Sequence, residues 1–193
     1  MNNKKMYLLQ WFGPFRSVKE LAEWEEQKEK EGKRFFLYFL QGKRQKERKT
    51  RYYCGMTFKQ KSVASRMKNH DHHIHEFELR EKHLFIWVGT ISNLRRAKKD
   101  DVSLCEKILT SYLVQAYQTY DGEIVNATNY KAPKDTDIYI INEWYNWKNE
   151  MECLRRTSGS VSQIIPDVLS YYADGNSIYS SKRLKCECEI VKR

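Results

Sequence analysis

The chain has 193 residues, of which 40% are hydrophobic and 13% are aromatic, and its formal net charge is +10. This length and apolar content are enough for one domain with additions, and they argue against a chain that is disordered throughout. The excess of cations favours a polyanionic partner.

The cysteines and the apolar runs limit where the chain could act. No stretch approaches the roughly 18 consecutive apolar residues of a transmembrane helix, and the N-terminus lacks the apolar core of a signal peptide. The five cysteines form no Cys-x-x-Cys pair, which argues against a disulfide framework or a structural zinc site. We therefore expect a cytoplasmic protein with reduced thiols and no membrane partner.

The first predicted element is a helix over residues 14–32. Ser17 and Glu20 have the spacing of a capping box, apolar residues follow at helical intervals, and Gly32 stands just past the end. The acidic outer face of this helix is expected to be solvated.

Strands and helices then alternate. Residues 35–41 and 51–56 are rich in Phe, Tyr and Leu, which predicts two strands joined by a long basic loop. A short helix should run from about residue 62 to about residue 70. Residues 83–91 predict a third strand, and the apolar spacing over residues 101–117 predicts a second long helix.

The pattern is less regular after residue 122. Residues 137–147 favour a strand that feeds a turn, and residues 157–162 are the best internal boundary. Residues 162–175 suggest a short helix, and residues 176–193 a terminal strand or hairpin.

The order strand, strand, helix, strand, helix predicts a small α+β fold built on a three-stranded antiparallel sheet flanked by helices. On this basis the chain divides into an N-terminal helical extension (residues 1–34), a core (residues 35–130) and a C-terminal extension or small subdomain (residues 131–193).

Candidate functional residues lie in and after the two predicted strands. FLY ends in Tyr38 and YCG begins with Tyr53, so each strand carries one tyrosine in a similar setting. RMKNH begins with Arg66 and ends with His70, and this spacing of four puts both side chains on one helix face.

These segments, in this order, resemble the GIY-YIG nuclease family over residues 35–130. The Gly-Ile of the family's first motif is Phe36-Leu37 here. The resemblance implies that Glu106, in the segment LCEKILTSYL, binds a metal ion. It also implies that Asn126 closes the site, with Asn129 as the competing candidate.

The resemblance implies an endonuclease that hydrolyses phosphodiester bonds in DNA, expected to be double-stranded, with Mg²⁺ (or Mn²⁺) as cofactor. Mg²⁺ prefers carboxylate and water oxygens, which suits Glu106. Arg66 could donate two parallel hydrogen bonds to the scissile phosphate. Tyr53 is favoured as the base for the attacking water, with Tyr38 orienting it or sharing the role, and His70 could support a tyrosine or a phosphate oxygen.

The basic segment between the two tyrosine strands is the candidate DNA-binding surface. The cations expected to contact phosphates are Lys43, Arg44, Lys46, Arg48, Lys49 and Arg51. A second basic cluster, LRRAKK, lies at residues 94–99.

Each candidate residue also has an ordinary structural explanation. Strand tyrosines are usually core or cross-strand aromatics, a helix arginine is often a surface cation, and a carboxylate beside an apolar stripe is common. The histidines at positions 70, 72, 73, 75 and 83 favour a polar connection able to touch DNA, with metal binding as the minor alternative.

Two other functions stay open. One is a non-catalytic nucleic-acid-binding module that binds phosphate with its basic loop and stacks bases on its tyrosines. The other is a structural or interaction protein whose positive charge is incidental. Glu106 discriminates between an enzyme and a binding module, because a binding module needs no metal carboxylate beside its basic groove.

Overall fold

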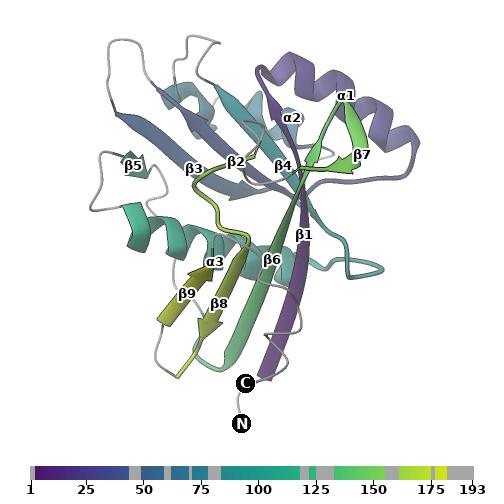
Figure 1. Cartoon of the computed structure of the whole chain (residues 1–193). Coiled ribbons are helices and arrows are strands. Elements are labelled where there is room, and N and C mark those ends of the chain that lie inside the picture. Colours follow the sequence, from purple (N-terminus) through teal and green to yellow (C-terminus); the bar gives the residue numbers. More distant parts are fainter. Residues whose placement is uncertain are drawn as a thin grey trace.

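The computed structural model of the chain describes residues 3–43, 49–58, 62–69, 71–77, 84–117, 122–124, 133–154, 161–174 and 177–181. Nine strands form one mixed sheet, and helices pack on both of its faces, so the fold class is α+β, as predicted (Figure 1). No helix in these ranges is long and apolar enough to cross a membrane.

The sheet runs in the order β5-β3-β2-β4-β1-β6-β8-β9, and β7 pairs with β6 off this path. The strands are β1 (Asn3–Phe15), β2 (Leu37–Gly42), β3 (Thr50–Met56), β4 (Phe85–Ile91), β5 (Gly122–Ile124), β6 (Thr136–Asn146), β7 (Asn149–Cys153), β8 (Val168–Tyr172) and β9 (Ser177–Ser181). The β1–β6 and β3–β5 pairs are parallel, and the others are antiparallel.

The helices begin where the sequence signals predict. In α1 (Val18–Lys30) the Oγ atom of the N-cap Ser17 accepts a hydrogen bond of 3.1 Å from the N–H of Glu20, and Gly32 follows the end with φ of +74°. The short α2 (Val63–Met67) begins after the N-cap Ser62 and is followed by the 3₁₀ helix η1 (His73–Phe77). Helix α3 (Lys99–Tyr117) covers the second long prediction.

The prediction of a three-stranded antiparallel sheet is wrong. The three predicted strands do lie side by side as β3-β2-β4, but the sheet continues through β5 on one side and through β1, β6, β8 and β9 on the other. Strand β1 was not predicted, because the sequence signals near the N-terminus point to the helix that follows it. The short helix expected within residues 162–175 is also wrong, since β8 occupies that segment and pairs with β6.

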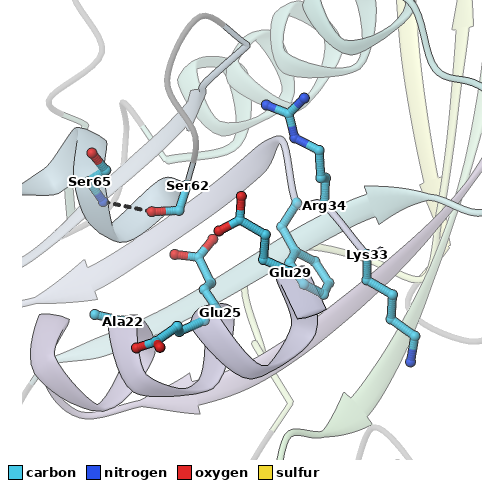
Figure 2. Close-up of a pocket in the computed structure, with 9 residues that line it drawn as sticks. Ala22, Glu25, Glu29, Lys33, Arg34, Ser62 and Ser65 are labelled. Atoms are coloured by element: carbon cyan, nitrogen blue, oxygen red, sulfur yellow. Dashed lines mark hydrogen bonds between the residues drawn. The ribbon is translucent and has the colours of Figure 1, made fainter. Parts of the chain in front are cut away.

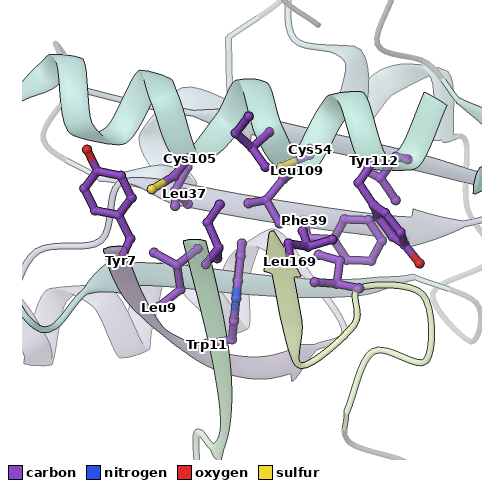
Figure 3. Close-up of a cluster of buried hydrophobic side chains, with 14 of the residues drawn as sticks. Tyr7, Leu9, Trp11, Leu37, Phe39, Cys54, Cys105, Leu109, Tyr112 and Leu169 are labelled. Carbon is purple, nitrogen blue, oxygen red and sulfur yellow. The ribbon is translucent and has the colours of Figure 1, made fainter. Parts of the chain in front are cut away.

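Two apolar cores lie on opposite faces of the sheet. Alternating strand residues such as Leu37, Phe39 and Cys54 pack under α3, as Figure 3 shows. The intervening residues, such as Tyr38 and Leu40, pack under α1 and α2. The fold therefore presents Tyr38 to the α1–α2 layer.

Candidate active site

The two candidate tyrosines lie side by side. Tyr38 on β2 and Tyr53 on the neighbouring β3 stack with their ring centroids 5.9 Å apart. Tyr38 is 1% exposed, whereas Tyr53 is half-buried. The two hydroxyl groups are hydrogen-bond partners. The two strands therefore bring two phenol groups together at one point of the α1–α2 face.

Gly55 allows this arrangement. It lies directly opposite Tyr38 in the β2–β3 register, and a Cβ atom at this position would stand 2.5 Å from both the Cζ and Oη atoms of Tyr38. Such a contact is far shorter than a normal carbon–carbon approach. The glycine of YCG therefore leaves the space that the Tyr38 ring fills.

A buried histidine, His72, contacts the hydroxyl of Tyr38. The Nε2 atom of His72 lies 2.9 Å from the Oη atom of Tyr38, and its Nδ1 atom accepts a hydrogen bond of 2.9 Å from the N–H of Ile74. His72 is only 2% exposed, and burial, followed by the positive charge of Arg66, lowers the pKa of its ring to about 4. The ring is therefore neutral over the whole physiological range.

Burial also shifts the pKa of both tyrosines. Loss of hydration raises the pKa of Tyr38 most strongly, with the nearby Tyr53 adding to the effect. Burial raises the pKa of Tyr53 as well, but the hydrogen bond from Tyr38 acts in the opposite direction. Arg66 lowers the pKa of both phenols, and Glu106 raises both.

Arg66 approaches the pair from α2. Its Nη1 atom lies 2.8 Å from the Oδ1 atom of Asp71, and this ion pair is partly open to solvent, with the Arg66 side chain 25% exposed. The guanidinium therefore faces a carboxylate that a phosphate could replace, and its charge acts on the pKa of both phenols.

A buried carboxylate on α1 fixes the start of α2. The two oxygens of Glu25 accept hydrogen bonds of 2.9 and 2.8 Å from the backbone N–H groups of Val63 and Ala64. Figure 2 shows Glu25 beneath the Ser62–Ser65 turn, at a pocket of about 260 Å³ between the two helices. Burial raises the pKa of Glu25, and these donors oppose the rise. Arg66 therefore projects from a helix whose first turn is anchored.

Glu106 belongs to α3, on the other face of the sheet from Tyr38 and Tyr53, and lies at the edge of β3. Strand β5 covers β3 over Thr50–Tyr52, so Met56 lies beyond the paired part of that edge. The backbone N–H of Met56 donates a hydrogen bond to the Glu106 carboxylate, which is 7% exposed. Burial raises the pKa of Glu106 to about 7.

Glu106 fits a Mg²⁺ ion as a single protein ligand. Its carboxylate is a hard oxygen donor, and Mg²⁺ in proteins keeps several waters and takes substrate phosphate oxygens for its other positions. Within the described residues no three His, Cys, Asp or Glu side chains gather into a cluster that could hold a metal by themselves. A cation held by Glu106 would therefore take its remaining ligands from water and from a substrate phosphate.

Several predicted residues lie outside the described part of the chain. These are His70, Asn126, Asn129, Arg44, Lys46 and Arg48. In the basic segment, Lys49 is exposed and Lys43 half-buried, but Arg51 is only 8% exposed. Arg51 pairs in register with Gly42, at the end of the hairpin away from Tyr38.

Three contributors to the site were not predicted. His72 was one of five histidines in a polar run, and nothing in the spacing indicated which ring is buried. Glu25 was grouped with its solvated acidic neighbours, although it is 5% exposed. Gly55 carried a signal, since a glycine inside a strand often marks a close approach of another group.

Comparisons of the chain with protein-family models, with curated proteins and with solved structures find no match.

Proposed function

We propose that the chain is a metal-dependent endonuclease that hydrolyses phosphodiester bonds in DNA, built on a GIY-YIG-type core of β2, β3, β4, α2 and α3. The observation that carries the proposal is the stacked pair of tyrosines on neighbouring strands, on the sheet face that α2 and its Arg66 cover. Tyr38 and Tyr53 stack, and Arg66 and Glu106 lie near enough to shift the pKa of both phenols.

Each side chain has a role that its chemistry suits. The Arg66 guanidinium, permanently charged and planar, binds the non-bridging oxygens of the scissile phosphate and displaces Asp71 to do so. Tyr53 takes the proton of the attacking water as a phenolate, a form that the positive charge of Arg66 favours against the effect of burial, and Tyr38 holds it by a hydrogen bond. Glu106 would hold Mg²⁺, which supplies charge stabilisation at the phosphate and the leaving oxygen.

The proposed setting follows from the thiols. Cys54 and Cys105 are free and buried, as expected of a protein that works in the reducing cytoplasm. The proposed partner is double-stranded DNA, in keeping with the net charge of +10.

The experiment is plasmid cleavage by the purified protein with and without Mg²⁺, together with the Arg66→Lys and Glu106→Ala variants. We expect Mg²⁺-dependent nicking or linearisation. Both variants should lose about 100-fold or more in rate, because lysine cannot make the two-pronged phosphate contact and alanine cannot bind a cation.

Arg95→Lys, at an exposed arginine outside the site, is the matched control and should cleave normally. DNA binding without cleavage under any divalent cation would instead favour the non-catalytic nucleic-acid-binding module. Normal cleavage by Glu106→Ala would overturn the metal assignment.

A further inference from the structure

The hydrogen bonds behind the tyrosine pair have a fixed direction. The Nδ1 atom of His72 accepts the N–H of Ile74 at 2.9 Å, so it carries no proton in the neutral ring. The ring proton must then be on Nε2, the atom that lies 2.9 Å from the Oη atom of Tyr38. His72 is therefore the donor and Tyr38 the acceptor in that bond.

The direction of the His72–Tyr38 hydrogen bond determines the direction of the next one, between Tyr38 and Tyr53. Because the oxygen of Tyr38 already accepts the His72 donor, its own hydroxyl proton is available for its other hydrogen-bond partner, the stacked Tyr53. The chain of donors runs from Ile74 N–H to His72, and from His72 through Tyr38 to Tyr53. A phenolate at the end of such a chain gains a donor, and hydrogen bonds in series strengthen one another.

The two phenols also differ in their exposure to solvent, and this difference again favours Tyr53 as the base. Tyr38 is 1% exposed and packed against Gly55, so its oxygen cannot meet a water or a phosphate. Tyr53 is half-buried. Its ring centroid lies 5.8 Å from that of His72, which precedes η1, and 5.2 Å from that of His73, the first residue of η1. The other titratable or charged groups that act on its pKa are Tyr38 on β2, Cys54 on β3, Arg66 on α2 and Glu106 on α3.

We infer that His72 is a positioning residue that selects Tyr53 as the base of the site and keeps Tyr38 as a protonated hydrogen-bond donor. The role in cleavage rests on the proposed function. In that step the Tyr53 phenolate takes a proton from water and becomes neutral. The resulting hydroxide forms a bond to phosphorus while the bond from phosphorus to the leaving oxygen breaks, and the leaving oxygen takes its proton from solvent.

The first test needs no variant and no substrate. Nitrogen-15 NMR of the protein near pH 7 should show His72 as a neutral ring protonated on Nε2, with Nδ1 unprotonated. Titration of ¹³Cζ-labelled tyrosines, assigned with Tyr→Phe variants, should show Tyr53 ionising before Tyr38. A ring protonated on Nδ1, or earlier ionisation of Tyr38, would overturn the inference whether or not the protein cleaves DNA.

The second test compares two substitutions of the histidine. His72→Gln keeps an N–H donor near the Nε2 position and should retain most of the cleavage rate, whereas His72→Phe removes it. His72→Phe and Tyr38→Phe should both move the rising limb of the pH–rate profile upward, by about one pH unit for the direct partner Tyr38. Tyr53→Phe should lose about 100-fold or more.

The outcomes separate the inference from the proposed function. If no variant and no wild-type protein cleaves DNA, the proposed function fails, and the NMR results still decide the direction of the hydrogen-bond chain. If the wild-type protein cleaves and Tyr53→Phe cleaves normally, the assignment of Tyr53 is overturned. An unshifted pH–rate profile in both Tyr38→Phe and His72→Phe would overturn the proposed hydrogen-bond chain from His72 through Tyr38 to Tyr53.

Discussion

Gly55 and Glu106 are both unfavourable for folding when each is considered alone. A glycine inside a strand adds no side chain to the core, and a carboxylate that is 7% exposed loses most of its hydration. Residues that break local rules of stability in this way are expected where function requires them. At the residue scale, these two positions therefore allow stability and function to be separated.

Glu106→Gln should stabilise the protein at alkaline pH. The folded pKa of about 7 lies above the ordinary value of 4.5, so the folded state binds the proton more tightly and stability falls as pH rises from 4.5 to 7. Above pH 7 the neutral amide removes this penalty, which is on the order of 3 kcal/mol. Thermal unfolding at pH 8 should give a higher Tm for the variant.

Thermal unfolding near pH 4.5 is the control, because both folded proteins are uncharged there at position 106 and should unfold at similar temperatures. Added Mg²⁺ should raise the Tm of the wild type at pH 8 and leave that of the variant unchanged. Equal stabilisation of both proteins by Mg²⁺ would contradict the assignment of Glu106 as a ligand.

Gly55→Ala should displace the Tyr38 ring, because the new Cβ would stand 2.5 Å from its Cζ and Oη atoms. Gly89→Ala is the matched control, since a Cβ there would stand 2.9 Å from the Trp11 ring. Both variants should lose stability by about 1–3 kcal/mol. Only Gly55→Ala should shift the Tyr38 ¹³Cζ resonance and the cleavage rate; a rate equally reduced in both would point to general destabilisation.

At the scale of elements, α1, α2 and α3 were predictable because their signals are local. Ser17 and Ser62 stand at the two N-caps, and apolar spacing marks the buried face of α3. What the local signals omit is how α2 is held. Its five residues are too few to form a stable helix in isolation, and the two bonds from Glu25 supply a fixed start.

Glu25→Met should loosen α2. It removes both acceptors at once and leaves the N–H groups of Val63 and Ala64 buried without them, which costs about 1–3 kcal/mol for each group. We expect cleavage to fall more than stability, because Arg66 loses its position. Glu26→Met, at the exposed neighbour, is the control and should change little. Hydrogen exchange at residues 63 and 64 reports the change directly, and unaltered protection there would contradict it.

The order of the candidate residues along the sequence was enough to choose Tyr38 and Tyr53, which the fold places side by side, while the roles of Arg66 and Glu106 stay predictions. The burial of His72 could not be predicted from the sequence, because it depends on contacts with Tyr38 and Tyr53, which precede it by 34 and 19 residues. The same holds for β1, whose partners β4 and β6 are remote in sequence. The sheet was therefore predicted too small, although its β3-β2-β4 part was identified.

At the scale of the whole molecule, the sheet crosses both predicted domain boundaries. Trp11 on β1 is fully buried, stacks on Trp144 of β6 with centroids 5.7 Å apart, and donates a hydrogen bond of 2.8 Å to Asn142. These contacts join the segments before and after the predicted core. The division at residues 34 and 130 is thus a hypothesis about function, while the apolar core is shared.

The positive charge of the whole molecule predicts salt-dependent DNA binding. Replacing Lys43, Arg44, Lys46 and Arg48 by Gln should lower affinity and reduce the salt slope by about 0.9 for each phosphate that the protein no longer neutralises. Single-turnover cleavage at saturating enzyme should stay near normal. The reason is distance from the tyrosines, because Gly42, at the loop end of β2, is four residues from Tyr38, or about 13 Å along the strand.

The control removes the same charge elsewhere: Arg95, Arg96, Lys98 and Lys99, all exposed, are replaced by Gln. Equal effects of the two fourfold variants would mean that net charge alone governs binding. An unchanged slope in the first variant would show that the loop is a solvated turn.

The place of β1 in the sheet also has a consequence for synthesis of the protein. Trp11 and its hydrogen-bond partner Asn142 are 131 residues apart in the chain. At translation rates of about 5–20 residues per second, the first strand leaves the ribosome roughly ten seconds before its parallel partner. During that interval an apolar strand destined for the middle of the sheet has no β6 beside it. Folding of the nascent chain should therefore be governed by late closure across β1 and β6, with chaperone binding to the N-terminal segment as its observable mark.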